Sequence, residues 1–184
     1  MLKKLLPLFF SVVFCFNAYG QYNMENSLGL KFGESTAEAK SQVLAALKVS
    51  PEYTSSEALT YFDVLFAGRK TEKLQLNFHK DKLVSVSAVF SVADLDRVYS
   101  EYLNIVSELK DNYGEPTWST WNVKVGYENE KDSNALNTAL LIGNIMASNS
   151  WMIGEEKQKN TKVTIESGGN RKILLLYSNG EAES

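Results

Sequence analysis

The chain has 184 residues, of which 44% are hydrophobic and 22% are charged, and its formal net charge is −3. This composition predicts a folded chain with a packed core, and the acidic balance argues against nucleic acid, because proteins bind its phosphates through basic patches. A single cysteine, Cys15, leaves no partner for an intrachain disulfide.

The first twenty residues have the pattern of a secretory signal peptide. Two lysines precede an apolar run, residues 5–16, and the small residues Ala18 and Gly20 form a cleavage pattern. The run is too short to span a bilayer, which needs about 20 apolar residues. Bulky residues stand immediately before Cys15, where lipoprotein processing requires small ones. We therefore expect residues 1–20, including this cysteine, to be removed.

Removal of this segment would leave residues 21–184 as a periplasmic or secreted chain without cysteine. Such a chain has no disulfide, no thiolate metal site and no thiol nucleophile. Its most apolar stretch, Ala139 to Ala147, has about half the length that a membrane span requires. The range is long enough to bury a core without a disulfide, so we expect a single domain over residues 21–184.

A capping box predicts the first helix. Ser35 and Glu38 are three residues apart, so the hydroxyl of the first can accept from the backbone of the second while the carboxylate reaches back. Apolar residues then recur at helical spacing until Pro51 prevents continuation. We expect a helix over residues 36–48.

Three strands are predicted to follow as an antiparallel meander. Residues 59–66 are rich in aromatic and branched side chains, with a turn at residues 67–70, and residues 73–79 alternate between polar and apolar types. Lys80 and Asp81 form a tight reversal. The last run also alternates, and the residues expected on its core face are Val84, Val86, Ala88 and Phe90.

One continuous apolar stripe predicts a second helix over residues 95–113. Apolar residues recur every three or four positions along it, and Gly114 and Pro116 end it. Asp94 and Asp96 stand at its start, where carboxylates cap free amides and meet the positive end of the helix dipole. We interpret them as capping residues and not as Ca²⁺ ligands, since no calcium-loop spacing is present.

The rest of the chain contains three predicted strands and one ambiguous segment. Alternation predicts a strand over residues 121–127, and residues 163–177 form two strands around Gly168 and Gly169, a hairpin pattern without the lysine of a phosphate-binding loop. The segment from Ala135 to Ile153 fits a helix and a strand equally well, and the choice stays open here.

This order of elements predicts an α+β protein. Two helices, each amphipathic on one side, are expected to pack on one face of a curved antiparallel sheet. The order of one helix and three strands, then one helix and three or four strands, is compatible with a duplicated α-β-β-β unit.

Parts of the sequence resemble small exported bacterial domains of unassigned function. The stretches that carry the resemblance are residues 28–33, residues 74–78 with Lys82 and Leu83, and residues 109–116. Such domains have a TATA-binding-protein-like or β-lactamase-inhibitor-protein-like arrangement of helices on a curved antiparallel sheet. The resemblance implies a short first strand over residues 28–31, and it brings no catalytic motif.

We identify no catalytic constellation, metal site or cofactor site in the sequence. His79 is the only histidine and falls on the polar face of its predicted strand beside a turn, so we expect an exposed side chain and no Zn²⁺ site. The alternative is an envelope hydrolase of glycosidase type, which would use a carboxylate pair drawn from residues such as Asp63, Glu155 and Glu156.

Aromatic residues carry the main functional hypothesis. Trp118, Trp121, Tyr127 and Trp151 gather in the second half of the chain, and aromatic faces outside a core often stack on sugars, peptides or protein partners. Trp121 shares its parity with predicted core residues, whereas Trp118 and Trp151 stand next to loops. We expect a non-catalytic exported module that binds a protein, peptide or glycan through these residues in the cell envelope or outside the cell. A purely structural subunit is a further alternative.

Overall fold

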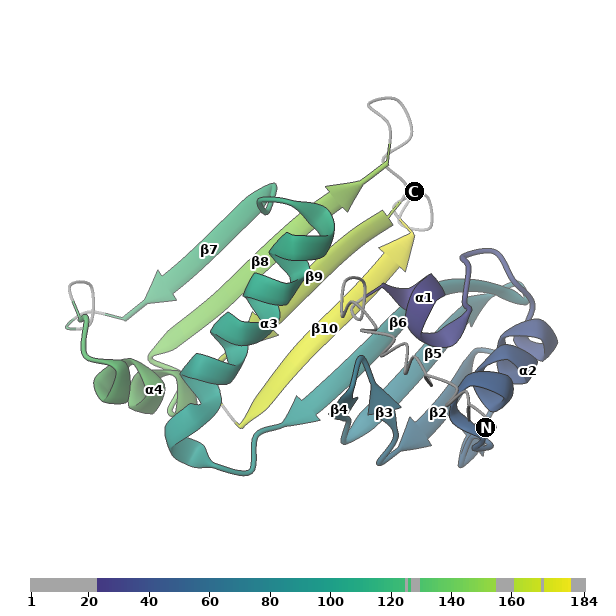
Figure 1. Ribbon diagram of the computed structural model, residues 1–184, viewed down its shortest axis with the longest axis horizontal. Coiled ribbons are helices and arrows are strands. Elements are labelled where there is room, and N and C mark those ends of the chain that lie inside the picture. The colour runs from purple at the N-terminus through teal and green to yellow at the C-terminus, as the bar shows by residue number, and fades with distance from the viewer. Residues whose placement is uncertain (1–22, 125, 127–129, 155–160, 170, 180–184) are drawn as a thin grey trace, which may run out of the picture.

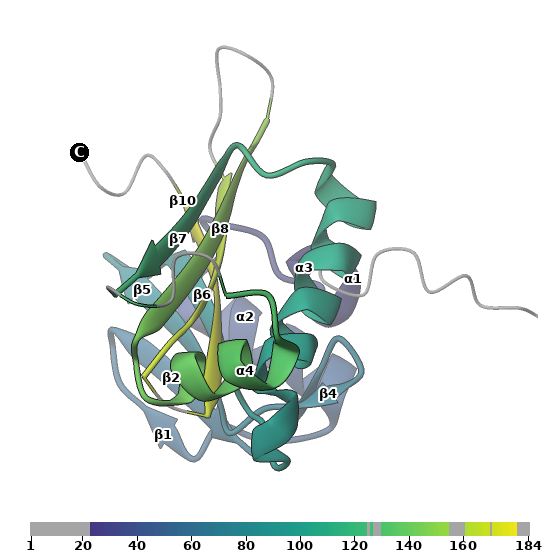
Figure 2. The same ribbon diagram turned by 90° about the vertical axis from the view of Figure 1, so that its left-hand side faces the viewer.

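The computed structural model describes residues 23–124, 126, 130–154, 161–169 and 171–179, and its central feature is an eight-stranded antiparallel sheet. The strand order is β1-β2-β5-β6-β10-β9-β8-β7, and β3 and β4 form a separate two-stranded hairpin. Helices α1, α2 and α3 lie on one face of the sheet (Figures 1 and 2). The predicted α+β class is therefore confirmed.

The helices are α1 (Met24–Leu28), α2 (Thr36–Leu47), α3 (Val98–Tyr113) with a preceding 3₁₀ turn (Leu95–Arg97), and α4 (Ser133–Leu141). The strands of the first half are β1 (Tyr53–Thr54), β2 (Ala58–Phe62), β3 (Leu65–Phe66), β4 (Arg69–Lys70), β5 (Lys73–His79) and β6 (Lys82–Ser91). Those of the second half are β7 (Trp118–Val123), β8 (Ile145–Ile153), β9 (Thr161–Ser167) and β10 (Lys172–Asn179). Among the helices of the described residues, none has the length and apolar character needed to cross a bilayer.

The sheet is symmetric in the order of its strands. The first half of the chain supplies β1, β2, β5 and β6, and the second half supplies β7, β8, β9 and β10 from the opposite edge inward. The last strand of each half, β6 and β10, pair at the centre from Ser91 opposite Lys172 to Ser85 opposite Ser178. Each half therefore has one main helix followed by four strands of the sheet, one strand more than the predicted α-β-β-β unit. The β3–β4 hairpin is added to the first half and α4 to the second.

The core lies between the sheet and the helices. The apolar stripe of α3 is buried as predicted, through Val98, Tyr102, Ile105, Val106 and Leu109. Every second residue of β5 is buried beneath the helices, as the alternation predicts for a strand with one face on a core.

The predicted capping box of α2 is confirmed. Ser35 Oγ accepts from the Glu38 backbone N–H at 3.3 Å, and Glu38 Oε2 accepts from the Ser35 backbone N–H at 2.9 Å. These two bonds satisfy amides that a helix N-terminus leaves without partners. The helix ends at Leu47, one residue before the predicted end, because Lys48 takes a left-handed φ of 60°.

The short first strand implied for residues 28–31 is wrong. Residues 24–28 form helix α1, whose N-terminus is capped by Asn23: its Oδ1 atom accepts from the backbone N–H groups of Glu25 and Asn26 at 2.9 and 3.2 Å. Gly29 ends the helix with a φ of 73°. A local cap thus outcompetes strand pairing at this end of the chain.

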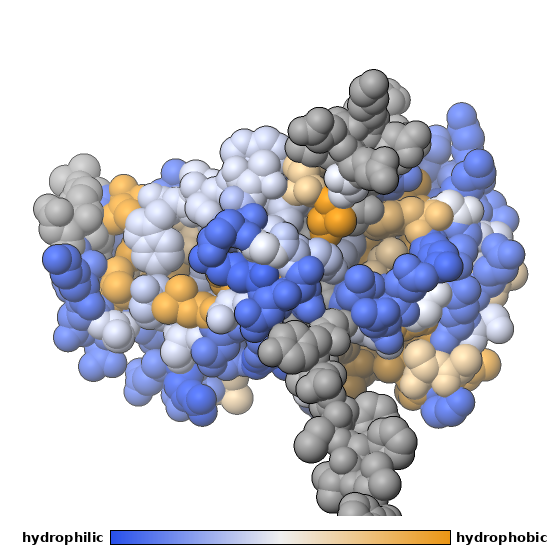
Figure 3. Space-filling model, turned by 45° about the horizontal axis from the view of Figure 1, so that its top comes forward, coloured by the Kyte–Doolittle hydropathy of each residue, from blue (hydrophilic) through white to orange (hydrophobic). Residues whose placement is uncertain are grey.

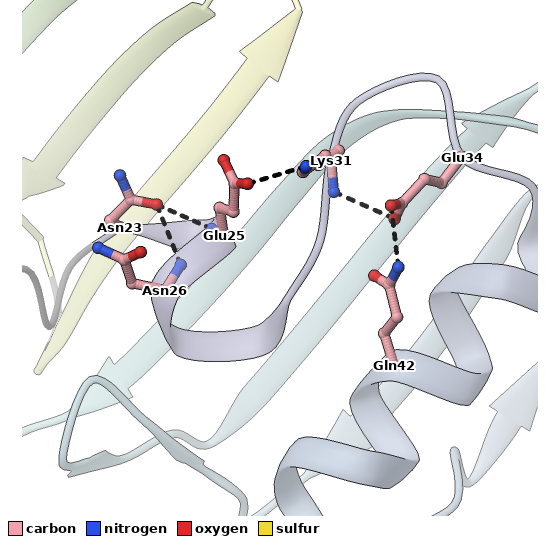
Figure 4. A network of polar contacts seen from close by, with 6 residues as sticks. All are labelled: Asn23, Glu25, Asn26, Lys31, Glu34 and Gln42. Atoms are coloured by element: carbon pink, nitrogen blue, oxygen red, sulfur yellow. Dashed lines mark hydrogen bonds and ion pairs between the residues drawn. The ribbon is translucent and has the colours of Figure 1, made fainter.

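Polar contacts fix the loop between α1 and α2 (Figure 4). The Glu34 carboxylate accepts from the Lys31 backbone N–H at 3.1 Å and from Gln42 Nε2 at 2.9 Å. The Lys31 ammonium lies 3.0 Å from the Glu25 carboxylate, and this contact raises the pKa of Lys31. These side-chain contacts connect the two helices. The loop is also bonded to β6, because the Gly33 N–H donates to the Leu83 carbonyl oxygen at 2.9 Å and the Leu83 N–H donates to the Glu34 carbonyl oxygen at 2.8 Å.

The predicted strand over residues 59–66 is divided in two. Asp63 has a φ of 55°, so strand β2 ends at Phe62 and the chain leaves the main sheet. Residues 65–66 and 69–70 then pair as the β3–β4 hairpin around Ala67 and Gly68, which have φ values of 52° and 75°. The predicted turn is therefore correct in place but shorter than residues 67–70. Positive φ at both central residues matches the right-handed twist of the strands in a two-residue hairpin.

The meander of β2, β5 and β6 is confirmed, with one change of register. Lys80 and Asp81 form the predicted tight turn, with φ values of 50° and 59°. A bulge beside Asn77 and Phe78 then shifts the pairing. As a result Leu83 is buried and Val84 is only half-buried, so the expectation that Val84 faces the core is wrong.

The strand predicted over residues 121–127 begins and ends earlier, at Trp118 and Val123. The ambiguous segment from Ala135 to Ile153 contains both structures, since α4 is followed by β8. The predicted C-terminal hairpin is confirmed as β9 and β10. Gly143, with a φ of 72°, lies against the β9–β10 turn, and a Cβ atom there would stand only 3.1 Å from the Gly169 Cα atom.

A buried hydroxyl in β2 predicts alkaline instability. Tyr61 is fully buried, its hydroxyl has no hydrogen-bond partner among the described residues, and burial, with a smaller contribution from Glu52, raises its pKa to about 12. Between the unfolded and folded pKa values only the unfolded chain loses the proton, so stability is lost as the pH rises above about 10. We expect a loss of about 2 kcal/mol in the free energy of unfolding near pH 12.

Urea denaturation at about pH 8 and about pH 11 measures the part of this loss that is complete at pH 11, about 1.4 kcal/mol. Burial also raises the pKa of Tyr113 to about 12, so the substitution Tyr61→Phe should remove part of the pH dependence and not all of it. At neutral pH Tyr61→Phe should leave the protein at least as stable, because it removes a buried polar group that lacks a partner. An unchanged alkaline slope in this variant would contradict the assignment.

Candidate functional site

The described helices leave the opposite face of the sheet uncovered (Figure 2). Strand registers place one residue of each strand in a row across this face. In order from β1 to β7 the row consists of Tyr53, Thr60, Gln75, Ser87, Leu176, Thr164, Ser150 and Trp118. We call it the central row.

The central row contains no charged residue, although 22% of the chain is charged. Aromatic residues stand at both of its ends: Tyr53 packs edge-on against Phe62 with ring centroids 6.0 Å apart, and Trp118 is 57% exposed. On the side of the molecule seen in Figure 3, hydrophilic residues cover much of the surface, with hydrophobic residues between them. The central row itself is uncharged and has an aromatic ring at each end.

Polar side chains beside the central row hold one another in place. Gln75 Nε2 donates to Asn77 Oδ1 at 2.6 Å, and Asn77 Nδ2 donates to Ser85 Oγ at 2.9 Å. These three half-buried side chains lie on neighbouring strands of the meander. Amide and hydroxyl groups can each donate and accept, so this part of the face can offer hydrogen bonds to a ligand without presenting a net charge.

A shallow hollow of about 510 Å³ lies on the same face over the second half of the sheet. Its apolar lining comes from Val89, Leu174 and Met146, and its polar lining includes Thr120 and Ser148. This volume lies within the range that small-molecule sites occupy.

Gly168 bounds this hollow at the β9–β10 turn. A Cβ atom on Gly168 would stand 2.9 Å from Met146 Cγ and 3.0 Å from the Ile145 carbonyl oxygen. A side chain at this position would therefore push the hairpin away from β8. The glycine that the sequence assigns to turn formation also allows this close packing.

Among the described residues that line the hollow, one is charged, Lys172. Lys172 Nζ lies 2.5 Å from Glu72 Oε1, and Ser91 Oγ also donates to the Glu72 carboxylate. These contacts, that of Lys172 foremost, hold the pKa of Glu72 below its usual range. Lys172 therefore already has an acidic partner.

The structure does not bring together the three of the four predicted aromatic residues that it describes, Trp118, Trp121 and Trp151. Trp118 lies on the open face, whereas Trp121 lies on the helix-covered face of the same strand, 42% exposed, with its ring 6.0 Å from that of Tyr99. Trp151 is 1% exposed. Tyr127 lies outside the described residues.

Trp151 belongs to the core. Its indole Nε1 donates to the Gly114 carbonyl oxygen at 2.8 Å, so β8 is tied to the end of α3. The sequence places Trp151 beside a loop, but β8 continues to Ile153, and the tryptophan shares its buried face with Ile145 and Ala147. We therefore leave Trp151 out of the candidate surface.

Sequence reasoning missed the residues that form most of this surface. Leu174 and Leu176 lie on the open face and are half-buried, although the sequence analysis selected neither of them as a candidate site residue. The signal was present, because five apolar or aromatic residues in succession, residues 173–177, cannot all face one side of a strand. Tyr53 and Phe62 had no such signal, since their meeting depends on the pairing of β1 with β2.

The residues considered for catalysis that the structure describes lie on different elements. His79 is exposed at the end of β5, as predicted. Asp63 forms a surface ion pair with Lys70 at 2.9 Å, and Glu155 and Glu156 lie outside the described residues. Asp94 caps the following turn by accepting from the Asp96 backbone N–H at 3.1 Å, as predicted. Within the described ranges, no three His, Cys, Asp or Glu side chains gather as a metal site would require.

Comparison of the chain with protein-family models, curated proteins and solved structures found no match. The open sheet face is therefore the basis of the functional proposal.

Proposed function

We propose that this protein is an exported, non-catalytic module that recognises a protein, peptide or glycan with the open face of its sheet. The central row carries the proposal. Interface cores are depleted of charged residues and enriched in aromatic ones. The row is uncharged across all eight strands and has an aromatic residue at each end. The pattern of residues 1–20 supports a location in the cell envelope or outside the cell.

The chemistry of the face suits recognition by shape and neutral hydrogen bonds. Trp118 can stack on a sugar ring, a peptide side chain or an aromatic residue of a partner. Gln75 and Ser87 supply neutral donors and acceptors at the middle of the row, and Leu176 supplies an apolar contact beside them. The sheet holds these groups on a rigid frame, so little conformational freedom is lost on binding.

A charge placed in the central row should abolish binding. The wild-type chain is immobilised and exposed to a glycan array and to a peptide-display library, and the retained ligand is then titrated against Leu176→Lys. We expect an affinity loss of at least about tenfold, because the lysine charge would be buried without a partner in the complex.

The matched control is Leu44→Lys, which makes the same change at an exposed position of α2. It should retain wild-type affinity, and both variants should keep the wild-type melting temperature. Equal losses in the two variants would contradict binding through the open face. Turnover of a glycoside, ester or peptide that is lost when one carboxylate is neutralised would contradict the non-catalytic assignment.

A further inference from the structure

Strand β7 is an edge strand without the usual protection against pairing. Natural edge strands are blunted by charged residues, by proline or by shortness, and the other edge, β1, has only two residues. The sequence of β7, WSTWNV, has six residues with neither charge nor proline, and the first five are exposed. No described helix or strand lies beyond it (Figure 1).

The backbone groups that β7 directs outward can be assigned from its pairing with β8. The Lys124 N–H donates across to the Asn144 carbonyl at 2.8 Å, and the Met152 N–H points back toward β7 and reaches Thr117 Oγ1 at 3.1 Å. Both contacts place the even-numbered residues of this segment in the hydrogen-bonded positions of the ladder. Because these positions alternate along an antiparallel pair, Ser119, Trp121 and Val123 direct their N–H and C=O groups toward the free edge.

We propose that β7 pairs with β7 of a second copy of this chain, antiparallel, about a two-fold axis at Trp121. In this register Trp121 stands opposite Trp121, and Ser119 stands opposite Val123 of the second copy. Each hydrogen-bonded pair of residues exchanges two bonds, so the three outward residues of β7 form about six hydrogen bonds with the second copy in this register. If the two strands were shifted by one such pair, about four would form. The centred register is thus the one that leaves fewest backbone groups without a partner.

Side chains fit the same register on both faces. On the helix-covered face the two Trp121 rings meet, and each is 42% exposed without the second copy. On the open face Trp118 stands opposite Lys124 of the second copy, an arrangement in which an ammonium group can lie over an indole ring. Thr120 stands opposite Asn122, and no two like charges face each other across the join.

This complementarity favours a second copy over an unrelated extended peptide. In an isologous contact the same surface of each copy must be complementary to itself. Strand β7 meets this condition: its outward backbone groups are unpaired, its centre is neutral, and the register places a cation opposite its indole ring. The dimer would extend the sheet and place the two open faces side by side. It does not depend on what the open face binds.

Charge substitution at the two-fold axis tests the register. We expect the wild-type chain to sediment as a dimer, and Trp121→Arg and Trp121→Glu each to sediment as a monomer, because the register places like charges opposite each other. An equal mixture of the two variants should recover the dimer, since Arg then faces Glu. Circular dichroism and melting temperature monitor the fold of each variant.

Cysteine cross-linking supplies an independent readout in a Cys15→Ser background. Opposed residues of a hydrogen-bonded pair have Cα atoms about 5.5 Å apart, within disulfide range, so Trp121→Cys should oxidise to a covalent dimer. In the same register the two copies of residue 118 lie about 20 Å apart, so the control Trp118→Cys should not cross-link.

A wild-type chain that stays monomeric at every concentration would overturn the proposal, even if it binds an added extended peptide at β7. A dimer that is unchanged by both charged variants, or equal cross-linking at residues 118 and 121, would also overturn it. A failure of the dimer leaves the test of the open face unaffected, because Leu176 lies on a central strand away from this edge.

Discussion

Truncation of Trp151 to alanine should lower the free energy of unfolding by about 3 to 5 kcal/mol. Trp151 is the largest of the fully buried side chains among the described residues, and its removal would leave a cavity between β8 and the helices. The Gly114 carbonyl oxygen would also lose the indole N–H that donates to it at 2.8 Å. Urea denaturation followed by far-ultraviolet circular dichroism measures the loss.

Trp118→Ala is the matched control, because it makes the same substitution on an exposed ring of the neighbouring strand. Its effect on stability should stay within about 0.5 kcal/mol. Equal losses for the two variants would show that Trp118 is structural, and it would then have to be removed from the proposed surface. A loss below about 1 kcal/mol for Trp151→Ala would contradict its place in the core.

Truncation of Leu109 to alanine should cost about 2 to 5 kcal/mol. Leu109 is fully buried on the stripe of α3 that packs on the sheet, and alanine would remove most of that contact. The substitution should not lower the intrinsic stability of the helix, since alanine has the highest helix propensity. The loss therefore measures packing alone and can be determined from the midpoint of urea denaturation at constant m-value.

Leu103→Ala on the same helix serves as its control. Leu103 is 43% exposed and lies off the buried stripe, so the same substitution should change stability by less than about 0.5 kcal/mol. If Leu103→Ala costs as much as Leu109→Ala, the side of α3 that faces the sheet has been assigned incorrectly.

Helix limits and tight turns were predicted closely because neighbours along the chain decide them. Ser35 and Glu38 form their capping box within one turn, and the reversal at Lys80 and Asp81 depends on their own backbone angles. Strand limits and core residues were predicted incorrectly where a single residue interrupts the hydrophobic pattern. Asp63, with its positive φ, divides an apolar run that reads as one strand, and the bulge beside Asn77 exchanges Val84 for Leu83 in the core.

The candidate surface was predicted less well than the fold. Of the four aromatic residues selected from the sequence, Trp118 alone lies on the open face among those that the structure describes. Proximity to a loop was a poor guide to exposure, since Trp118 and Trp151 both stand near loops and only one of them is exposed. The family resemblance, which no comparison tests, stays a prediction.

The sequence by itself determined the acidic and nearly cysteine-free composition, the two main helices, the meander and the final hairpin, because composition and contacts within a few residues specify them. The tertiary structure decided the rest. Pairing between strands far apart along the chain, such as β6 with β10, aligns the uncharged residues into one row and leaves β7 as an open edge. The energy of such pairing depends on residues distant in sequence, so no local pattern contains it.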